Sequence, residues 1–165
     1  MEKILISRCL LGHPVRYDGG DNRLDLACLA LWQSQGRLVP VCPEVEGGLP
    51  IPRPPAEQGH GRVMTCDGQD VTAQFRRGAT LAVAKVKAQG IRLAILKARS
   101  PSCGSGLIYD GSFSRTVIPG DGITAAALKQ TGVTVFTELE LAQAESLLAA
   151  LEGRETSGIT ELDGK

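Results

Sequence analysis

TAQFRRGATLAVAKVKAQGIRLAILK, residues Thr72–Lys97, is the segment from which the architecture follows. Its first part, Thr72–Gln89, has the composition and length of a helix, and Gly90 stands where helices commonly end. The second part, Ile91–Lys97, is a short apolar run that is typical of a strand. A helix that leads through a glycine into a strand is half of a β-α-β unit, so we predict a parallel sheet.

The same alternation of strand and helix patterns continues on both sides of this segment. The other predicted strands are Lys3–Arg8, Arg37–Cys42 and Val133–Phe136, and the other predicted helices are Asn22–Gln35, Ile123–Gln130 and Thr137–Leu151. Thr137 and Glu140 have capping-box spacing at the start of the last helix. Pro40 is unfavourable within a central strand, because it cannot donate to a ladder. We predict an α/β fold: a small Rossmann-like or flavodoxin-like parallel sheet of about four strands, with helices on both faces.

Two loop or hairpin inserts interrupt this alternation, and each follows a predicted strand. Residues 43–71 come after the second strand and residues 100–119 after the third. Residues 43–61 are too rich in proline and glycine for a helix or a central strand. Asp-Gly pairs at 67–68 and 110–111 each predict a turn between short β-like runs. Both inserts are expected at the carboxyl edge of the sheet, where open α/β folds bind ligands.

The composition of the chain narrows the classes of protein to which it can belong. The chain has 165 residues, with 18 basic and 18 acidic side chains that cancel to a formal net charge of zero. This balance is atypical of nucleic-acid binders, which carry a basic excess. No apolar run approaches the roughly 20 residues of a membrane helix, and MEKILISRCLLG at the N-terminus lacks a secretory cleavage pattern. We expect a cytoplasmic protein with one domain at residues 1–152 and a polar, disordered tail at 153–165; its oligomeric state cannot be inferred.

Three of the five cysteines lie directly after predicted strands: Cys9, Cys42 and Cys103. Neighbouring strands are about 4.8 Å apart, so the three side chains can meet in one pocket. Converging thiolates need a cation, and a soft metal or an iron–sulfur cluster is their natural partner. Clusters usually take four cysteines, so three would leave one iron open. The pattern equally allows three small buried hydrophobic residues.

The other two cysteines fit structural roles. The odd count and the absence of any CxxC pair argue against a disulfide framework or a redox pair. Cys28 lies inside a predicted amphipathic helix, which favours a place in the core. Cys66 lies beside the Asp-Gly turn at 67–68 and is interpreted as an ordinary loop residue.

Two carboxylates follow the second of the three cysteines. Glu44 and Glu46 flank Val45 directly after Cys42. A buried carboxylate at this place could act as a general base, because burial moves its pKa toward neutrality. An exposed loop carboxylate without a catalytic role is the alternative.

Hydroxyl groups near the cysteines are candidate substrate contacts. Ser100 and Ser102 precede Cys103, and their hydroxyls either donate to a polar ligand or cap the turn. Tyr17 lies in a turn after the first strand and either contacts the ligand or belongs to the turn alone. We carry Ser102 and Tyr17 forward as predicted substrate-binding residues.

Several segments resemble a known family. They are SRCLLG (Ser7–Gly12), VRYDGG (Val15–Gly20), VCPEVEGGLPIPRPPAE (Val41–Glu57), DGQDVT with the following F..GA (Asp67–Ala79) and LKARSPSCG (Leu96–Gly104). Together they resemble the bacterial thiouracil desulfidase family in its stand-alone form, over about residues 1–150. The CPE and SPSCG motifs are the most specific part of this resemblance.

The resemblance implies a [4Fe–4S] cluster with one open iron, held by Cys9, Cys42 and Cys103. It also implies that Glu44 and Ser100 are catalytic, Glu44 by activating water and Ser100 by orienting the substrate or relaying a proton. The implied reaction is the non-redox conversion of 2-thiouracil to uracil and sulfide, with a small thiolated pyrimidine as the partner.

Two other functions fit the same residues. A non-catalytic carrier of metal, cluster or sulfur would need the three cysteines but neither Glu44 nor Ser100. A thiol hydrolase would use Cys103 as a nucleophile, with His13 or His60 as its base. Because aromatic residues are only 4% of the chain, we expect few rings for base stacking. Hydrogen bonds and an iron–sulfur contact would then hold the pyrimidine, and RNA is a poor substrate candidate.

Overall fold

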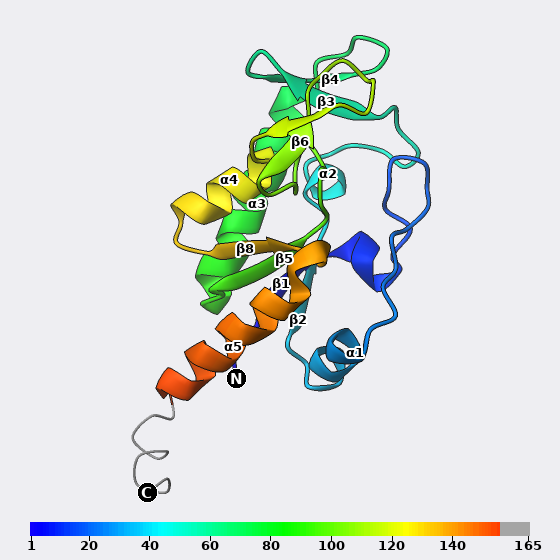
Figure 1. The fold of residues 1–165 in the computed structure, drawn as a ribbon. Helices are drawn as coiled ribbons and strands as arrows, with labels where there is room; N and C mark the ends of the chain where they lie inside the picture. Colours follow the sequence, from blue (N-terminus) through cyan, green and yellow to red (C-terminus); the bar gives the residue numbers. More distant parts are fainter. Residues whose placement is uncertain (156–165) are drawn as a thin grey trace, which may run out of the picture.

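The computed structural model describes residues 1–155, and its centre is a parallel four-stranded sheet (Figure 1). The strands are β1 (Ile4–Ser7), β2 (Leu38–Val41), β5 (Leu93–Leu96) and β8 (Thr134–Thr137), in the order β2-β1-β5-β8. In β1, Leu5 lies opposite Val39 on one side and Ala94 on the other. Because β2 is an edge strand, its outer side pairs with no neighbouring strand, and an edge strand tolerates the missing N–H of Pro40. The predicted α/β fold is confirmed.

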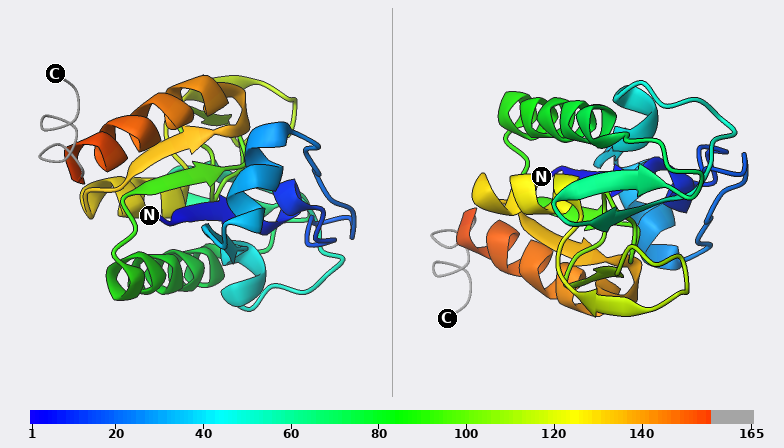
Figure 2. Two further views of the ribbon diagram at one scale, coloured as in Figure 1. Left: turned by 90° about the horizontal axis from the view of Figure 1, so that it is seen from below. Right: turned by 90° about the horizontal axis from the view of Figure 1, so that it is seen from above.

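Helices cover both faces of the sheet (Figure 2). They are α3 (Thr72–Gln89) and α4 (Ile123–Gln130) on one face, and α1 (Ala27–Ser34) and α5 (Leu141–Glu155) on the other. Leu5 packs with the first pair, whereas its neighbours Ile4 and Ile6 pack with the second. Successive residues of a strand point to opposite faces, so a short apolar strand supplies two cores at once. None of the helices within residues 1–155 combines the length and hydropathy that a bilayer crossing requires.

The helix boundaries follow the predictions with two differences. α3 and α4 have the predicted bounds, and both glycines that follow them have positive φ. The helix predicted from Asn22 begins only at Ala27. The amides of Asn22 and Leu24 instead donate to the carbonyls of Cys9 and Leu10, which belong to a 3-10 helix, η1 (Arg8–Leu11).

The last helix also differs in its bounds. Thr137 and Glu140 form the predicted capping box, which opens a short 3-10 helix, η2 (Glu138–Glu140), ahead of α5. α5 then continues to Glu155, beyond the predicted domain boundary at 152. Residues 156–165 of the predicted tail lie outside the described residues.

The first insert contains more regular structure than its composition predicts. Pro43–Glu46 forms a short helix, α2, where no helix was expected. Proline at the first helical position has a suitable φ, and its missing N–H needs no acceptor there. The insert then forms a hairpin of β3 (Ala56–Gly59) and β4 (Arg62–Thr65). Its turn is at residues 60–61; the Asp-Gly turn at 67–68 is present, but only an isolated bridge follows it.

The second insert contains the predicted hairpin. β6 (Leu107–Tyr109) pairs antiparallel with β7 (Val117–Pro119), and the Asp-Gly pair at 110–111 lies in their connection. In the view from above in Figure 2, both hairpins lie over the same end of the sheet.

Two glycines let α2 lie directly against α3. A Cβ atom on Gly78 of α3 would stand 2.0 Å from the carbonyl oxygen of Pro43, and one on Gly47 would stand 2.1 Å from that of Gln74. Real Cβ atoms do not approach backbone oxygens so closely. The backbone contact therefore fixes the position of α2, the helix that follows Cys42.

Replacing Gly78 with alanine should destabilise the protein by about 1 to 3 kcal/mol through overpacking. In an unobstructed helix the same change stabilises by about 0.5 to 1 kcal/mol. Gly153 of α5 is the matched control, because a Cβ there meets nothing within 4 Å. Urea unfolding should show opposite signs for Gly78→Ala and Gly153→Ala. A stabilised Gly78→Ala protein would contradict the close contact between α2 and α3.

Candidate active site

A cavity of about 840 Å³ lies at the carboxyl edge of the sheet. Ser7, Val41, Lys97 and Glu138, which stand at or just after the ends of the four strands, all line it. The two inserts supply much of the remaining wall. This is the edge at which parallel α/β sheets bind their ligands.

The cavity brings together the three cysteines that follow strands. Cys9 lies on η1, Cys42 immediately precedes α2, and Cys103 lies in the loop after β5. Cys42 and Cys103 are buried and Cys9 is partly buried. Burial raises the pKa of all three thiols. A thiol in such surroundings becomes a thiolate when a cation binds it.

The donor chemistry that these residues bring to the cavity is that of three thiols. Among residues 1–155, no group of three or more His, Cys, Asp or Glu side chains is arranged to hold one metal ion. The thiols nevertheless influence one another electrostatically across the cavity. A cluster attaches each thiolate to a different iron and so accepts a wider arrangement. Three sulfur donors in one cavity are a suitable ligand set for an iron–sulfur cluster.

Glu44 faces the cavity from α2 and is held by Arg53. The Oε1 atom of Glu44 accepts a hydrogen bond from Nε of Arg53 at 3.2 Å and forms an ion pair with Nη2 of the same side chain at 3.1 Å. Arg53 is itself fixed, since it also donates to the carbonyls of Pro50 and Val15. Burial raises the pKa of the Glu44 carboxyl, and the Arg53 charge opposes this shift. A carboxylate in this setting has the fixed position that a general base requires.

Ser100 links the carboxylate to the cysteine loop. Its Oγ accepts from the amides of Ser102 and Cys103 at 3.1 and 3.0 Å. With both amides directed at the oxygen, the hydroxyl proton turns to Oε2 of Glu44, 3.5 Å away. Ser100 thus caps the loop that carries Cys103 and also contacts the candidate base.

The structure separates the two candidate carboxylates. Glu46 does not line the cavity. Its Oε1 pairs with Lys85 of α3 at 2.8 Å, and its Oε2 accepts from the amide of Cys42 at 2.8 Å. Glu46 therefore braces α2 against α3, whereas Glu44 is available to a ligand.

The two predicted substrate-binding residues have different positions. Tyr17 lines the cavity and stays partly exposed. Ser102 does not line it: the side chain is fully buried, and its hydroxyl bonds that of Thr124 on α4 at 2.8 Å. Ser102 therefore packs the loop against α4 and does not face the cavity.

Several residues of the cavity wall were missed in the sequence. Arg53 lies in the proline-rich segment, where nothing local distinguishes it. Glu138 bonds the amide of Ala98 and pairs with Lys97, which braces the loop after β5.

Basic residues outnumber acidic ones in the cavity wall. The basic residues are Arg8, Arg16, Arg53, Lys97, Arg99 and Arg115, and the acidic residues are Glu44, Glu57 and Glu138. Such a wall stabilises negative charge that develops on a bound ligand.

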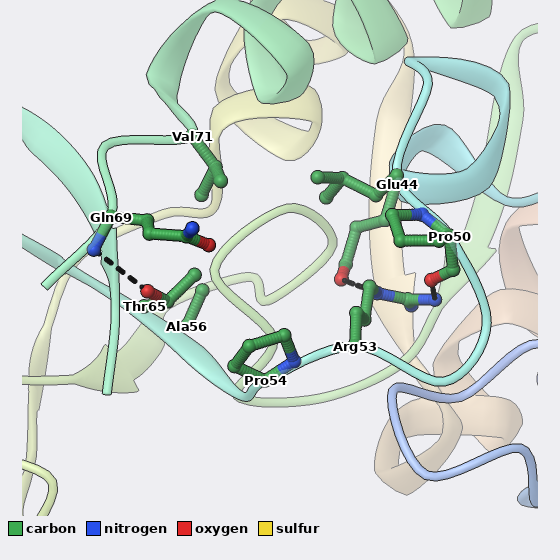
Figure 3. Close-up of a pocket in the computed structure, with 9 residues that line it drawn as sticks. Glu44, Pro50, Arg53, Pro54, Ala56, Thr65, Gln69 and Val71 are labelled. Atoms are coloured by element: carbon green, nitrogen blue, oxygen red, sulfur yellow. Dashed lines mark hydrogen bonds and ion pairs between the residues drawn. The ribbon is translucent and has the colours of Figure 1, made fainter. Parts of the chain in front are cut away.

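A smaller pocket of about 80 Å³ lies beside the cavity (Figure 3). Glu44 and Arg53 line both spaces. Figure 3 shows their ion pair at one end of the pocket and the Gln69 side chain pointing into it from the other. Small-molecule sites usually measure about 300 to 1,000 Å³, and a water occupies about 30 Å³. This pocket has room for a few waters next to Glu44, and only the larger cavity has room for a pyrimidine.

The remaining cysteines and the histidines lie elsewhere. Cys28 belongs to α1 and packs against the core, and Cys66 is exposed beside the Asp-Gly turn. His13 accepts from Nε of Arg8, and His60 occupies the turn between β3 and β4. Neither histidine is among the described residues that line the cavity, so neither is placed to serve Cys103.

Fold and site together define a small α/β protein with a three-cysteine cavity and one fixed carboxylate, a class suited to iron–sulfur chemistry. The chain belongs to the 2-thiouracil desulfurase family, whose model matches residues 4–140. It is 40% identical over 148 residues to the uncharacterized protein YbbK of Bacillus subtilis (strain 168), covering 84% of this chain and 97% of YbbK. It also resembles a solved structure of the [4Fe-4S]-dependent thiouracil desulfidase TudS. That match has a TM-score of 0.89 and 49% identity, and it covers 91% of this chain and 99% of TudS.

Proposed function

We propose that this protein removes sulfur from a small 2-thiolated pyrimidine, converting 2-thiouracil and water to uracil and hydrogen sulfide. One observation carries the proposal. Three thiols, a largely buried carboxylate and a hydroxyl share one cavity at the carboxyl edge of the sheet. The family to which the chain belongs supports the choice of substrate.

Cys9, Cys42 and Cys103 would hold a [4Fe–4S] cluster; the name of the relative TudS describes that protein as [4Fe-4S]-dependent. Three protein ligands would leave the fourth iron open. When bound, such a cluster supplies a soft Lewis acid that attracts the thiocarbonyl sulfur and polarises its bond to carbon.

The chain's own residues would activate water. Glu44 takes a proton from water, whose oxygen forms the new bond to the ring carbon as the carbon–sulfur bond breaks. The two protons of water end on sulfide, and no electron is gained or lost overall. Arg53 keeps the Glu44 carboxylate in place through a hydrogen bond and an ion pair. Ser100 orients the substrate or relays a proton between Glu44 and the ligand, which its 3.5 Å contact with Glu44 supports.

Anaerobic reconstitution followed by a turnover assay tests the proposal. We expect about four irons and four acid-labile sulfides per chain, and we expect 2-thiouracil to be converted to uracil with equimolar sulfide. A complete cluster without any uracil formation would instead favour the carrier function. Absence of a cluster under these conditions would contradict the proposal as a whole.

A further inference from the structure

Aromatic side chains are scarce in this chain, and three of them line the cavity. Only two tyrosines, three phenylalanines and one tryptophan occur in the sequence. Both tyrosines, Tyr17 and Tyr109, line the cavity together with Phe113. They come from a loop after η1, from β6 and from the β6–β7 connection. The expectation that few rings would be available to a substrate is therefore wrong for this cavity.

Phe113 adopts a backbone conformation that its residue type disfavours. Its φ is 58°, in the left-handed region, which is unusual for a bulky side chain. Within residues 1–155, the other non-glycine residues with positive φ are His60, Arg99 and Arg115, and the two arginines also line the cavity. Such conformations persist only where surrounding contacts hold them, and they concentrate at functional sites.

Glu57 of β3 holds the connection that carries Phe113. Its Oε1 accepts from the amides of Gly111 and Phe113 at 3.0 and 3.2 Å. Gly111 has a φ of 96°, and a Cβ there would stand 2.8 Å from the carbonyl oxygen of Gln58. The connection is thus fixed against β3 at two points. Phe113 itself lines the cavity and is 38% exposed.

We propose that Phe113 is a specificity-determining residue whose ring stacks on the flat pyrimidine of the substrate, and that Glu57 positions it. This inference rests on the proposed function and adds the means by which the site selects flat rings. Glu57 holds the backbone of Phe113, so the exposed ring gains apolar contact only when a ligand covers it. Base–aromatic stacking contributes enough to alter affinity about 5- to 150-fold.

The test compares 2-thiouracil with its 5,6-dihydro analogue, which has the same thiocarbonyl but a puckered ring. In Phe113→Leu the KM for 2-thiouracil should rise on the order of 10-fold, with kcat within about 2-fold. The KM for the dihydro analogue should change little. Phe113→Tyr keeps a ring and should behave as the unmodified protein.

A binding measurement separates this inference from the proposed function. Calorimetry with 2-thiouracil and cluster-free protein should show the same order of weakening for Phe113→Leu, whether or not turnover occurs. Equal effects on the flat and puckered ligands, or unchanged binding of both, would overturn the stacking role.

The positioning role of Glu57 is tested by removing or keeping the oxygen that accepts from the amides of Gly111 and Phe113. Glu57→Ala should raise the KM for 2-thiouracil as Phe113→Leu does, whereas Glu57→Gln keeps an oxygen acceptor and should restore it. The KM for 2-thiouracil of the Phe113→Leu/Glu57→Ala double variant should be no higher than that of Phe113→Leu alone, because the two changes remove the same contact. A Glu57→Ala protein with lowered kcat and unchanged KM would contradict the positioning role.

Discussion

Cys42→Ala is expected to abolish the [4Fe–4S] cluster and with it all desulfuration. Two remaining thiols cannot hold a cluster that needs three protein ligands, so iron and acid-labile sulfide should fall together after anaerobic reconstitution. The variant should still fold. The Cys42 backbone amide, not its thiol, bonds Glu46, and the contact of Pro43 with Gly78 involves backbone atoms.

The control for this experiment comes from the same chain. Cys66→Ala changes an exposed thiol outside the cavity, and Cys28→Ala changes a thiol on α1 that also lies outside it. Both should keep the full content of iron and sulfide. Urea unfolding of all three variants separates loss of ligands from loss of fold. A Cys42→Ala protein that keeps a complete cluster would remove Cys42 from the ligand set.

Glu44→Gln is expected to lower kcat by a factor of about 10² to 10⁴, the usual contribution of a general base. Glutamine keeps the shape and an oxygen that Arg53 can bond, but it cannot take a proton from water. The cluster should be unaffected, because Glu44 is not among the proposed ligands. Release of sulfide and uracil at saturating 2-thiouracil is the measurement, with iron content measured in parallel.

Glu145→Gln supplies the matched control, since it makes the same exchange on the exposed side of α5. It should retain full turnover. If Glu44→Gln also retained full turnover, the base would have to be another group. If it lost activity only in proportion to lost iron, Glu44 would support the cluster rather than the chemistry. Loss of turnover with a complete cluster would favour the enzyme over the carrier.

Strand ends were the most informative feature of the sequence. Apolar periodicity located four strands, and parallel topology then placed Cys9, Cys42 and Cys103 at one edge. This inference needed no side-chain detail, because residues that directly follow parallel strands all lie at the carboxyl edge of the sheet. The structure places all three in one cavity.

The sequence did not show which of two neighbouring polar residues faces the cavity. Glu44 and Glu46 are two positions apart on α2, yet one faces the cavity and the other pairs with Lys85. Ser100 and Ser102 separate in the same way. On a helix or in a tight loop, a shift of two residues turns the side chain toward a different neighbour. The packing partner therefore determines the role, and that partner is remote in sequence.

Local patterns in this chain were sufficient for the four helices that cover the sheet, for the sheet and for the strand ends, but not for α2. Periodicity and glycine stops act over a few residues. Glu57 and Phe113 acquired their roles through a contact between residues 56 positions apart, and Arg53 is fixed in part by Val15, 38 positions away. Gly78 resembles any helix glycine until Pro43 is found against it. Long-range packing brings such groups together, and no short window of sequence records which residues will meet.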